Sequence, residues 1–375
     1  MFKKSVKRIS MALLMLFTIT KAQTEDSLTN NERAQKIAEK ARPAIMAAAY
    51  VKQQIAKIRN PQLRRLTEEL ITNPAPTYQA KAPLQKEREQ VLSELRSAGL
   101  ITAEVSLEGI YIPVKDPTKA AQSFLAAPGS YYRSAKSLAG HHSYPGGLAV
   151  HTAYNLRAGL SMIENYKRQY PLDTSGSGFS VDPDLVICGI VLHDIMKTLV
   201  FQWKKDGSLY EEQQIAGTGA HHILGIAEMY VRGFPAEAVI AMASAHDPTA
   251  PSPLRKKVVS YLRAAAIIAR VDPVSYGTLK AKDDELDIAS EARPEHFIVH
   301  LSDADYHYSG HAAAATVGIL RELAKTELGW SDEALDGERF NWLRNQLLAS
   351  HTEIGLYQLY LKKGSKALLR LISSK

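Results

Sequence analysis

The sequence almost lacks cysteine: among its 375 residues only Cys188 carries a thiol. A single thiol cannot form a disulfide within the chain, which excludes the small cross-linked scaffolds found among secreted proteins. Cys188 lies in the apolar segment LVICGIVL (185–192), which predicts a buried helix. We therefore expect this thiol to serve as a small apolar side chain rather than a reactive group.

A long apolar run is absent from the amino terminus, although a short one is present. The segment ISMALLMLFTIT (9–20) has 12 residues, whereas a membrane-spanning helix needs about 20. It follows the basic MFKKSVKR (1–8) and precedes Ala22, which is the layout of a secretory signal peptide. We predict cleavage near Ala22, export to a periplasmic or extracellular compartment, and no transmembrane span afterwards. An uncleaved amino-terminal anchor is the alternative.

An excess of positive charge is missing once this leader is set aside. The full chain has 46 Lys and Arg against 39 Asp and Glu, a formal net charge of +7. The leader holds five of the basic residues and no acidic one, which leaves 41 basic against 39 acidic side chains, a net charge of +2. Nucleic acid is therefore a partner that the charge of the mature chain does not support.

Strand patterns are scarce, and helix signals dominate. Only EGIYIPV (108–114) suggests a strand in the amino-terminal part, while VFQWKKDGSLYEE (200–212) predicts one short hairpin at Asp206-Gly207. Asn60-Pro61 has the form of a helix start, and Gly99 of a helix end. We predict an all-α protein with central helices near 147–168, 183–198, 212–232, 235–246 and 252–272. The expected divisions are a signal peptide (1–22), an amino-terminal helical extension (23–129), a core (130–280) and a carboxy-terminal helical extension (281–375).

Side chains that can bind metals recur along the predicted core. His151, the pair His193-Asp194, His221, His246 and Asp272 are separated by intervals that each hold roughly one helix and its connection. A helical bundle builds a metal site in its core from ligands on successive helices. Asp194 ends the apolar segment 185–192, and a buried charge is costly unless it is paired or coordinated.

The order H…HD…H…H…D resembles the HD-domain superfamily of metal-dependent phosphohydrolases, in particular its two-metal branch. A second stretch, GHHSYPGGLAVHT (140–152), resembles the HHxYxGGLxxHT block of HD-type 3′-to-5′ exoribonucleases and of HD-like relaxase amino-terminal domains. The similarity covers roughly 130–277, with a fainter trace in IRNPQLRRL (58–66). It implies an HD-domain helical bundle with helical extensions at both ends.

The resemblance also implies roles for the ligands. Two divalent transition-metal ions (Mn, Fe, Zn or Co) are expected, with Asp194 bridging them and a bridging hydroxide attacking the phosphorus. His151, His193 and Asp272 would complete the shell of one metal, and His221 and His246 would serve the other. Within the pair His221-His222, the spacing to Gly225 favours His221 as the ligand and leaves His222 near the substrate or behind the ligand.

Further residues are expected around the substrate. Lys197 lies one helical turn after Asp194 and could neutralise a phosphate oxygen, with a solvent-facing lysine as the alternative. His141 and His142 are expected at the mouth of the site, where Gly146-Gly147 could expose amides to an anion or simply permit a tight turn. Lys204 could face substrate if the 200–212 hairpin forms a lid; a solvated hairpin is the alternative.

Two histidine pairs in the carboxy-terminal part, His296/His300 and His307/His311, have a spacing that can hold zinc on one helix face. We prefer the alternative that these histidines lie on the surface or contact the metal ligands from outside the metal shell.

The predicted function is an exported two-metal phosphohydrolase acting on a small phosphate mono- or diester, with a nucleotide-derived substrate favoured. The competing hypotheses are an HD-fold diiron oxygenase and a non-catalytic envelope protein with a structural metal site. The sequence has neither a β-rich segment for an oligonucleotide-binding barrel nor the extended GYP motif of cyclic-dinucleotide enzymes. RNA and cyclic dinucleotides are therefore disfavoured as substrates.

Overall fold

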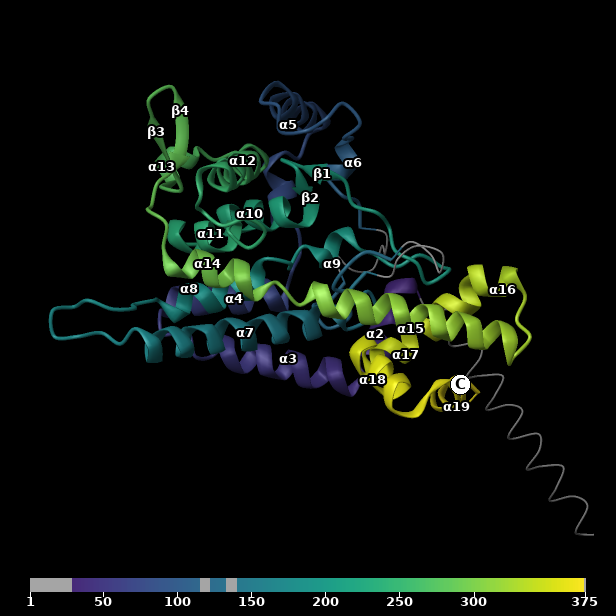
Figure 1. The fold of residues 1–375 in the computed structure, drawn as a ribbon. Helices are drawn as coiled ribbons and strands as arrows, with labels where there is room; N and C mark the ends of the chain where they lie inside the picture. Colours follow the sequence, from purple (N-terminus) through teal and green to yellow (C-terminus); the bar gives the residue numbers. More distant parts are fainter. Residues whose placement is uncertain (1–28, 115–121, 133–139, 374–375) are drawn as a thin grey trace, which may run out of the picture.

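A computed structural model describes residues 29–114, 122–132 and 140–373 (Figure 1). Helices make up most of this part of the chain, which confirms the all-α prediction. Two short antiparallel hairpins accompany them: β1 (Gln214–Ile215) with β2 (Thr218–Gly219), and β3 (Leu279–Lys282) with β4 (Glu285–Ile288). None of the helices in these three ranges has the length and apolar character needed to cross a membrane. The predicted signal peptide and its cleavage point lie outside the described residues.

The helices run in chain order as follows: α2 (Asn30–Ala38), α3 (Arg42–Ile55), α4 (Pro61–Thr72), the 3-10 helix η1 (Thr77–Lys81), α5 (Gln85–Ser97), α6 (Leu107–Ile110), α7 (Gly147–Gln169), α8 (Pro183–Leu192), α9 (Lys197–Val200), α10 (Ala220–Arg232), α11 (Ala236–Ala243), α12 (Ser252–Ala269), α13 (Pro273–Tyr276), α14 (Pro294–Ser302), α15 (Tyr306–Thr326), α16 (Asp332–Asp336), α17 (Glu338–His351), α18 (Glu353–Lys363) and α19 (Ser365–Ser373).

Local signals in the sequence account for several helix ends. The side chain of Asn60 caps α4 by accepting a hydrogen bond from the Leu63 amide at 3.1 Å, directly before Pro61. Gly99 follows α5 with a φ of +68°, a left-handed conformation that glycine adopts without steric cost. Both predicted boundaries are confirmed.

One of the two strand predictions was wrong, and the other was confirmed in reduced form. Residues 107–110 form the short helix α6, in which Ile110 is buried, instead of the strand predicted over 108–114. The segment 200–212 forms a minimal hairpin with one antiparallel bridge, between Trp203 and Leu209, and both bridge residues are buried rather than solvated. Trp203 is buried beside Trp342, 6.0 Å between ring centroids, and its Nε1 donates to Gln122 at 3.1 Å. The predicted turn is present, because the Lys204 amide donates to the Ser208 carbonyl at 2.8 Å across Asp206-Gly207, but burial of the indole keeps Trp203 from facing a substrate.

The apolar interior is continuous between the amino-terminal helices and the central ones. Helix α3 packs on α7, and α4 packs on α8, so the predicted amino-terminal extension shares one core with the predicted catalytic bundle (Figure 1). A second apolar cluster joins α15, α17, α18 and α19 to Ala41, Ala44 and Tyr144. Tyr144 belongs to the 140–152 stretch, so the carboxy-terminal helices meet the core at that stretch.

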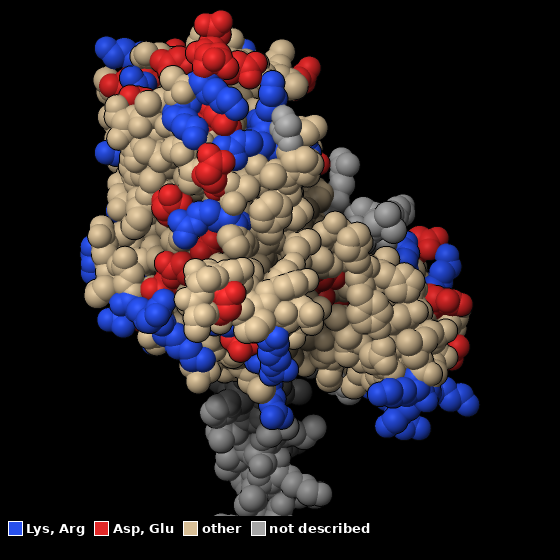
Figure 2. Space-filling model, turned by 60° about the vertical axis from the view of Figure 1, so that its left-hand side comes forward, with Lys and Arg blue, Asp and Glu red and all other residues tan. Residues whose placement is uncertain are grey.

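Charged side chains of both signs are interspersed on the face drawn in Figure 2. This distribution agrees with the nearly balanced charge of residues 23–375, which hold 41 basic and 39 acidic side chains. No broad field of one sign covers that face.

Candidate metal centre

Asp194 lies at the centre of a buried group of histidines. Helix α8 is buried along almost its whole length, and His193 and Asp194 follow it with 2% and 1% of their surface exposed. Oδ2 of Asp194 lies 3.2 Å from Nε2 of His151 and 3.3 Å from Nε2 of His193. Oδ1 lies 3.2 Å from Nε2 of His221. The carboxylate therefore presents one oxygen to each of two sets of imidazoles.

These side chains form two adjoining groups whose ligand atoms lie within 4.8 Å of one another inside each group. The first group contains His151, His193 and Asp303, and the second contains Asp194, His221 and His246. Helices α7 and α10 and the turns that follow α8, α11 and α14 deliver the six ligands. The structure thus brings together five of the six residues that the sequence pointed to, in the division that the HD resemblance implied.

Asp272 is the exception, and its predicted role is corrected. Its carboxylate is exposed and caps α13 by accepting hydrogen bonds from the amides of Val274 and Ser275 at 3.0 and 3.3 Å. Arg270 ends α12 in a left-handed conformation, with a φ of +56°, and the chain turns away from the cluster. Asp272 is therefore a helix cap on the surface.

Asp303 occupies the place that had been assigned to Asp272. It follows the last residue of α14, and its Oδ1 lies 3.0 Å from Nε2 of His151 and 3.5 Å from Nε2 of His193. Asn155, one turn after His151 on α7, donates to the same carboxylate oxygen at 3.0 Å. The first group is therefore completed by a residue of the predicted carboxy-terminal extension.

The rings of three histidines are held by hydrogen bonds on their Nδ1 atoms. Nδ1 of His193 donates to the carbonyl of Ile190 at 2.8 Å, and Nδ1 of His221 bonds to the Glu212 carboxylate at 2.7 Å. Nδ1 of His246 bonds to the hydroxyl of Thr218 at 2.9 Å. An outer hydrogen bond of this kind fixes the tautomer of a metal-binding histidine and leaves Nε2 available to the metal.

Several atoms at the centre of the cluster lack a hydrogen-bond partner within the described part of the chain. They are buried, and they include Nε2 of His193, Nε2 of His221 and Oδ1 of Asp194. Leaving such atoms unsatisfied costs about 1–3 kcal/mol each. Divalent cations held in the two groups would accept the lone pairs of these atoms, and imidazole with carboxylate suits Mn, Fe, Co or Zn. The residues present therefore fit a metal centre.

The electrostatics of the cluster favour bound positive charge. Burial opposes ionisation of Asp194, but the charges of His193 and Lys197 hold the pKa of its carboxyl well below the usual range. Burial also disfavours a charged His193, yet the carboxylates of Asp194 and Asp303 raise the pKa of its imidazole to about 10. The two carboxylates thus stabilise positive charge on the groups that face them.

Lys197 is buried rather than solvent-facing. Its ammonium donates to Oδ2 of Asp194 at 2.5 Å and to the carbonyl of Gly129 at 2.6 Å, with 6% of the residue exposed. The turn that follows α8 puts Lys197 at the start of α9, three residues after Asp194. An ammonium has three donors, so one remains free of these two bonds.

His221, and not His222, faces the cluster. His222 is fully buried, and its Nε2 donates to the carbonyl of Ala243 at 3.2 Å. Its ring stacks on that of His246 with centroids 4.0 Å apart, and burial lowers its pKa to about 4. His222 therefore supports His246 from behind and does not contact substrate.

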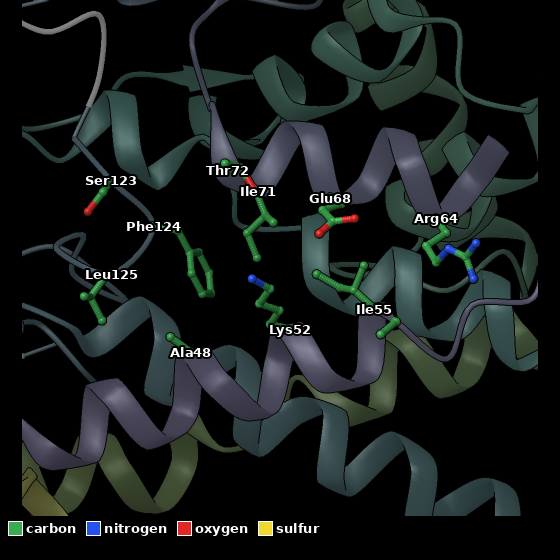
Figure 3. A pocket seen from close by; sticks show the side chains of 11 residues that line it. Ala48, Lys52, Ile55, Arg64, Glu68, Ile71, Thr72, Ser123, Phe124 and Leu125 are labelled. Atoms are coloured by element: carbon green, nitrogen blue, oxygen red, sulfur yellow. The ribbon is translucent and has the colours of Figure 1, made fainter. Parts of the chain in front are cut away.

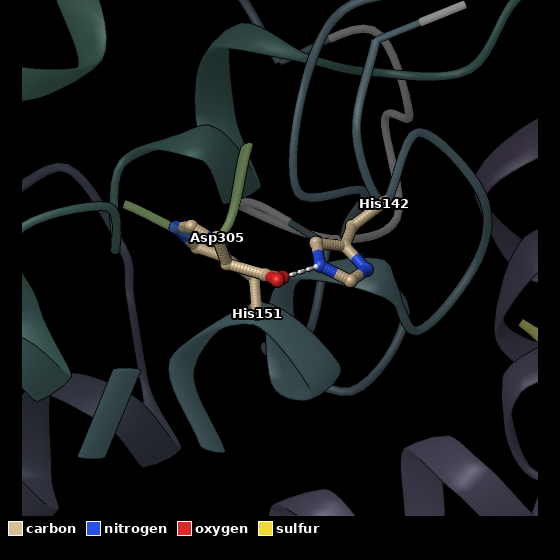
Figure 4. Close-up of side chains that lie close together, drawn as sticks. All are labelled: His142, His151 and Asp305. Carbon is tan, nitrogen blue, oxygen red and sulfur yellow. Dashed lines mark hydrogen bonds and ion pairs between the residues drawn. The ribbon is translucent and has the colours of Figure 1, made fainter. Parts of the chain in front are cut away.

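His142 is likewise closed off from substrate. Nε2 lies 2.6 Å from Oδ2 of Asp305 (Figure 4). Nδ1 lies 3.0 Å from Oε1 of Glu353, the first residue of α18. Burial would lower the pKa of this imidazole, but Glu353 and Asp305 raise it to about 9. His142, His151 and Asp305 also lie close enough to hold an ion. Because both nitrogens of His142 already bond to carboxylates, a proton rather than a metal balances that group.

His141, by contrast, is only partly buried. Its ring centroid lies 5.1 Å from that of His151, next to the first metal group. The structure therefore leaves His141 as the member of the pair that can reach a substrate.

The glycines before α7 serve packing. A Cβ on Gly147 would lie 1.8 Å from the carbonyl oxygen of His142, and Gly146 has a φ of +89°. The amides of Gly147 and Leu148 already donate to the carbonyls of Tyr144 and Ala127 at 2.8 and 3.0 Å. These two amides are occupied, which favours the tight-turn interpretation over anion binding.

The remaining predicted residues lie apart from the cluster. The ammonium of Lys204 lies over the ring of Tyr210, 5.3 Å from its centroid, and its substrate role stays a prediction. His296 is buried and bonds to Thr249 at 3.1 Å, while Nδ1 of His300 donates to the carbonyl of Ala245 at 2.8 Å. His296 and His300 thus hold α14 against the turn that carries His246.

Sequence reasoning missed four carboxylates: Glu212 behind His221, Asp303 in the cluster, and Asp305 and Glu353 around His142. The stretch LSDADYH (301–307) offered a signal, since it places two aspartates close together between the histidine pairs His296/His300 and His307/His311. Glu353 offered none, because its partner lies 211 positions earlier in the chain.

A cavity of about 450 Å³ lies elsewhere, between α3 and α4 (Figure 3). Its walls combine apolar side chains, among them Phe124 and Ile71, with Lys52, Arg64 and Glu68. It holds no histidine, so the candidate metal chemistry is separate from it.

Comparison with known proteins gives one informative likeness. Over 154 residues, which are 40% of this chain and 57% of the relative, the chain is 30% identical to a dihydroneopterin 2′,3′-cyclic phosphate phosphodiesterase of Methanocaldococcus jannaschii. The chain therefore spans less than two thirds of the length of that relative. No protein-family model and no solved structure matches the chain.

Proposed function

We propose that this chain is an exported metal-dependent phosphohydrolase that cleaves a phosphate diester of a small molecule. The observation that carries the proposal is the carboxylate of Asp194, which presents Oδ2 to His151 and His193 and Oδ1 to His221. Similarity to a cyclic-phosphate phosphodiesterase supports the reaction class and favours a diester over a monoester.

Each of the two ligand groups would hold one divalent transition-metal ion. Asp303 completes the first group in place of Asp272, and His246 completes the second. Two such ions lower the pKa of a bound water and neutralise charge on the phosphoryl oxygens during in-line attack. Asp194 would belong to both shells because its two oxygens face opposite groups.

The surrounding residues fix this arrangement. Glu212 holds the ring of His221, and Asn155 holds Asp303, so both ligands are oriented before substrate arrives. Lys197 keeps its ammonium on Asp194 and retains one N–H that can reach a phosphoryl oxygen. A fixed positive charge beside the phosphate favours the transition state, in which negative charge accumulates on those oxygens.

Export rests on the amino-terminal segment alone. A basic start, a 12-residue apolar run and Ala22 support a cleaved signal peptide. Expression in a bacterial host followed by mass measurement of the mature chain tests this. A mature chain starting near Gln23 supports export, and an intact chain in the cytosol contradicts it.

The central experiment combines metal analysis with a panel of phosphate mono- and diesters, using the full chain with added Mn²⁺. Asp303→Asn should lose bound metal and diester hydrolysis, whereas the matched control Asp272→Asn should keep both. Equal activity of Asp303→Asn and the wild-type chain would contradict the proposed centre. A metal-loaded chain that hydrolyses no ester and consumes oxygen would instead indicate an oxygenase.

A further inference from the structure

We propose that the rim of the metal centre carries an aromatic surface, formed by His141, Tyr306 and His307, that stacks against a planar heteroaromatic ring of the substrate. This inference rests on the proposed function, because it takes the phosphate to be held at Asp194. It goes beyond that function by naming the substrate class: phosphodiesters that carry a nucleobase-like or pterin-like ring.

The three rings form a continuous series that starts at a metal-ligand candidate. The ring of His141 lies 5.1 Å from that of His151 and 6.1 Å from that of Tyr306, measured between centroids. The ring of Tyr306 lies 4.2 Å from that of His307, tilted by 31°. The first two spacings fall in the range of 4.5–7 Å that is usual for paired aromatic rings, and the rings of Tyr306 and His307 lie closer still. The series therefore leads outward from the cluster without a break.

The outer members of the series are open to solvent. Tyr306 is 48% exposed, His307 is also exposed, and His141 is partly buried. Other tyrosines near the cluster are covered: Tyr144 and Tyr261 are 1% and 2% exposed. A substrate with its phosphate at Asp194 would therefore extend its organic part past His141 and meet the faces of Tyr306 and His307.

The backbone beneath this surface is held in place. Asp305, directly before Tyr306, bonds to Nε2 of His142 at 2.6 Å (Figure 4). Tyr306 begins α15, whose apolar face packs in the carboxy-terminal core. A rigid aromatic side chain on a fixed backbone loses little conformational entropy on binding, which suits it to recognition.

The chemistry of the surface selects the ligand class. The three rings offer broad apolar faces and no fixed negative charge of their own, so a flat heteroaromatic ring gains contact with them. A sugar or glycerol group has no such face. Stacking of a base on an aromatic side chain contributes about 1–3 kcal/mol, so its loss is expected to lower kcat/KM roughly tenfold or more.

The test compares two cyclic diesters that share the reacting group: adenosine 2′,3′-cyclic phosphate and glycerol 1,2-cyclic phosphate. Tyr306→Ala should lower kcat/KM for the adenosine ester about tenfold and leave the glycerol ester unchanged, with metal content retained. Tyr306→Phe should keep the preference. Tyr308→Ala is the matched control, because Tyr308 is 44% exposed on the same helix and its hydroxyl accepts a hydrogen bond from Gln358.

A binding measurement keeps this inference separate from the proposed reaction. Calorimetric titration with adenosine monophosphate and with glycerol phosphate should show tighter binding of the adenosine compound, and Tyr306→Ala should remove that difference. If the chain hydrolyses neither diester but the difference in binding is present, the proposed function fails and the stacking surface stands. Equal loss on both diesters, or no loss on either, overturns the surface.

Discussion

Two buried groups of histidine and carboxylate side chains lie next to each other in this protein, around His142 and around Asp194. In the first, both ring nitrogens of His142 meet carboxylates, at 2.6 and 3.0 Å. In the second, Nε2 of His193 and of His221 and Oδ1 of Asp194 have no hydrogen-bond partner within the described residues. Residue type alone does not distinguish the two groups. Around His142, Oε2 of Glu353 is unsatisfied among the described residues, whereas around Asp194 the unsatisfied atoms include two imidazole nitrogens that face the ligand groups. This difference indicates that a proton balances one group and metal ions the other.

The largest effect is expected from removing the carboxylate of Asp194, which faces both ligand groups. Asp194→Asn keeps the volume of the side chain but loses the charge that faces both ligand groups. We expect loss of both metals and a fall in diester hydrolysis of about 10³-fold or more. Elemental analysis and turnover measure this, and retention of two metals by Asp194→Asn would contradict a bridging role.

The next largest effect concerns the group around His142. Glu353→Ala leaves a buried imidazolium with one of its two carboxylates missing, which costs about 3–5 kcal/mol of unfolding free energy. Denaturant unfolding of the metal-bound chain measures the loss. Metal content of the folded variant should equal that of the wild type, and a parallel loss of metal would show that the two groups are not independent.

The pH dependence of stability tests whether His142 carries a proton in the folded chain. The pKa of His142 is raised to about 9 in the folded chain from an ordinary value near 6.5, so its charge stabilises the fold fully below about pH 6.5. That stabilisation declines as the pH rises through 9, by an amount on the order of 3 kcal/mol. The groups that face His142 are Asp305, Glu353, Tyr144, His141 and His151.

Unfolding free energies from pH 6 to 10 for the wild type and for His142→Gln measure this contribution. The wild-type curve should fall more steeply than the variant curve over that range. Parallel curves would mean that His142 carries no proton in the folded chain.

The smallest effect is expected at Glu212, which bonds to the metal-ligand candidate His221. Glu212→Gln keeps a hydrogen-bond partner for Nδ1 of His221 but removes the negative charge. Metal affinity of the second group should fall about 10- to 100-fold, since outer partners of ligands contribute on that scale. Competition with a chelator measures it, and Glu211→Gln, one position earlier and more exposed, serves as the control that should not change affinity.

Much of the fold and part of the metal centre could be predicted from the sequence. Helix starts such as Asn60-Pro61 depend on local geometry, so they could be predicted from neighbouring residues. His151, His193, Asp194, His221 and His246 follow a spacing of one ligand for each helix and connection, and the structure brings them together.

Asp272 was wrongly predicted as a metal ligand because it continued that spacing. The pair Asp272-Pro273 starts a helix in the same way as Asp182-Pro183, with the aspartate as its cap. Asp303 could not be placed from spacing, because the hairpin β3–β4 and helix α14 intervene before the chain returns to the cluster. The contact between His142 and Glu353 depends on how distant helices pack, which no local pattern encodes.

Residues 303–306 combine three tasks in one short connection: Asp303 faces the cluster, Asp305 bonds to His142, and Tyr306 opens onto solvent. Insertions or deletions in this connection would disturb all three together, so a lineage has little freedom to alter its length. Exchange of the side chain at position 306 or 307 leaves the backbone untouched. Diversification of ligand preference among descendants of this chain should therefore proceed by point substitution at these two positions rather than by remodelling of the loop.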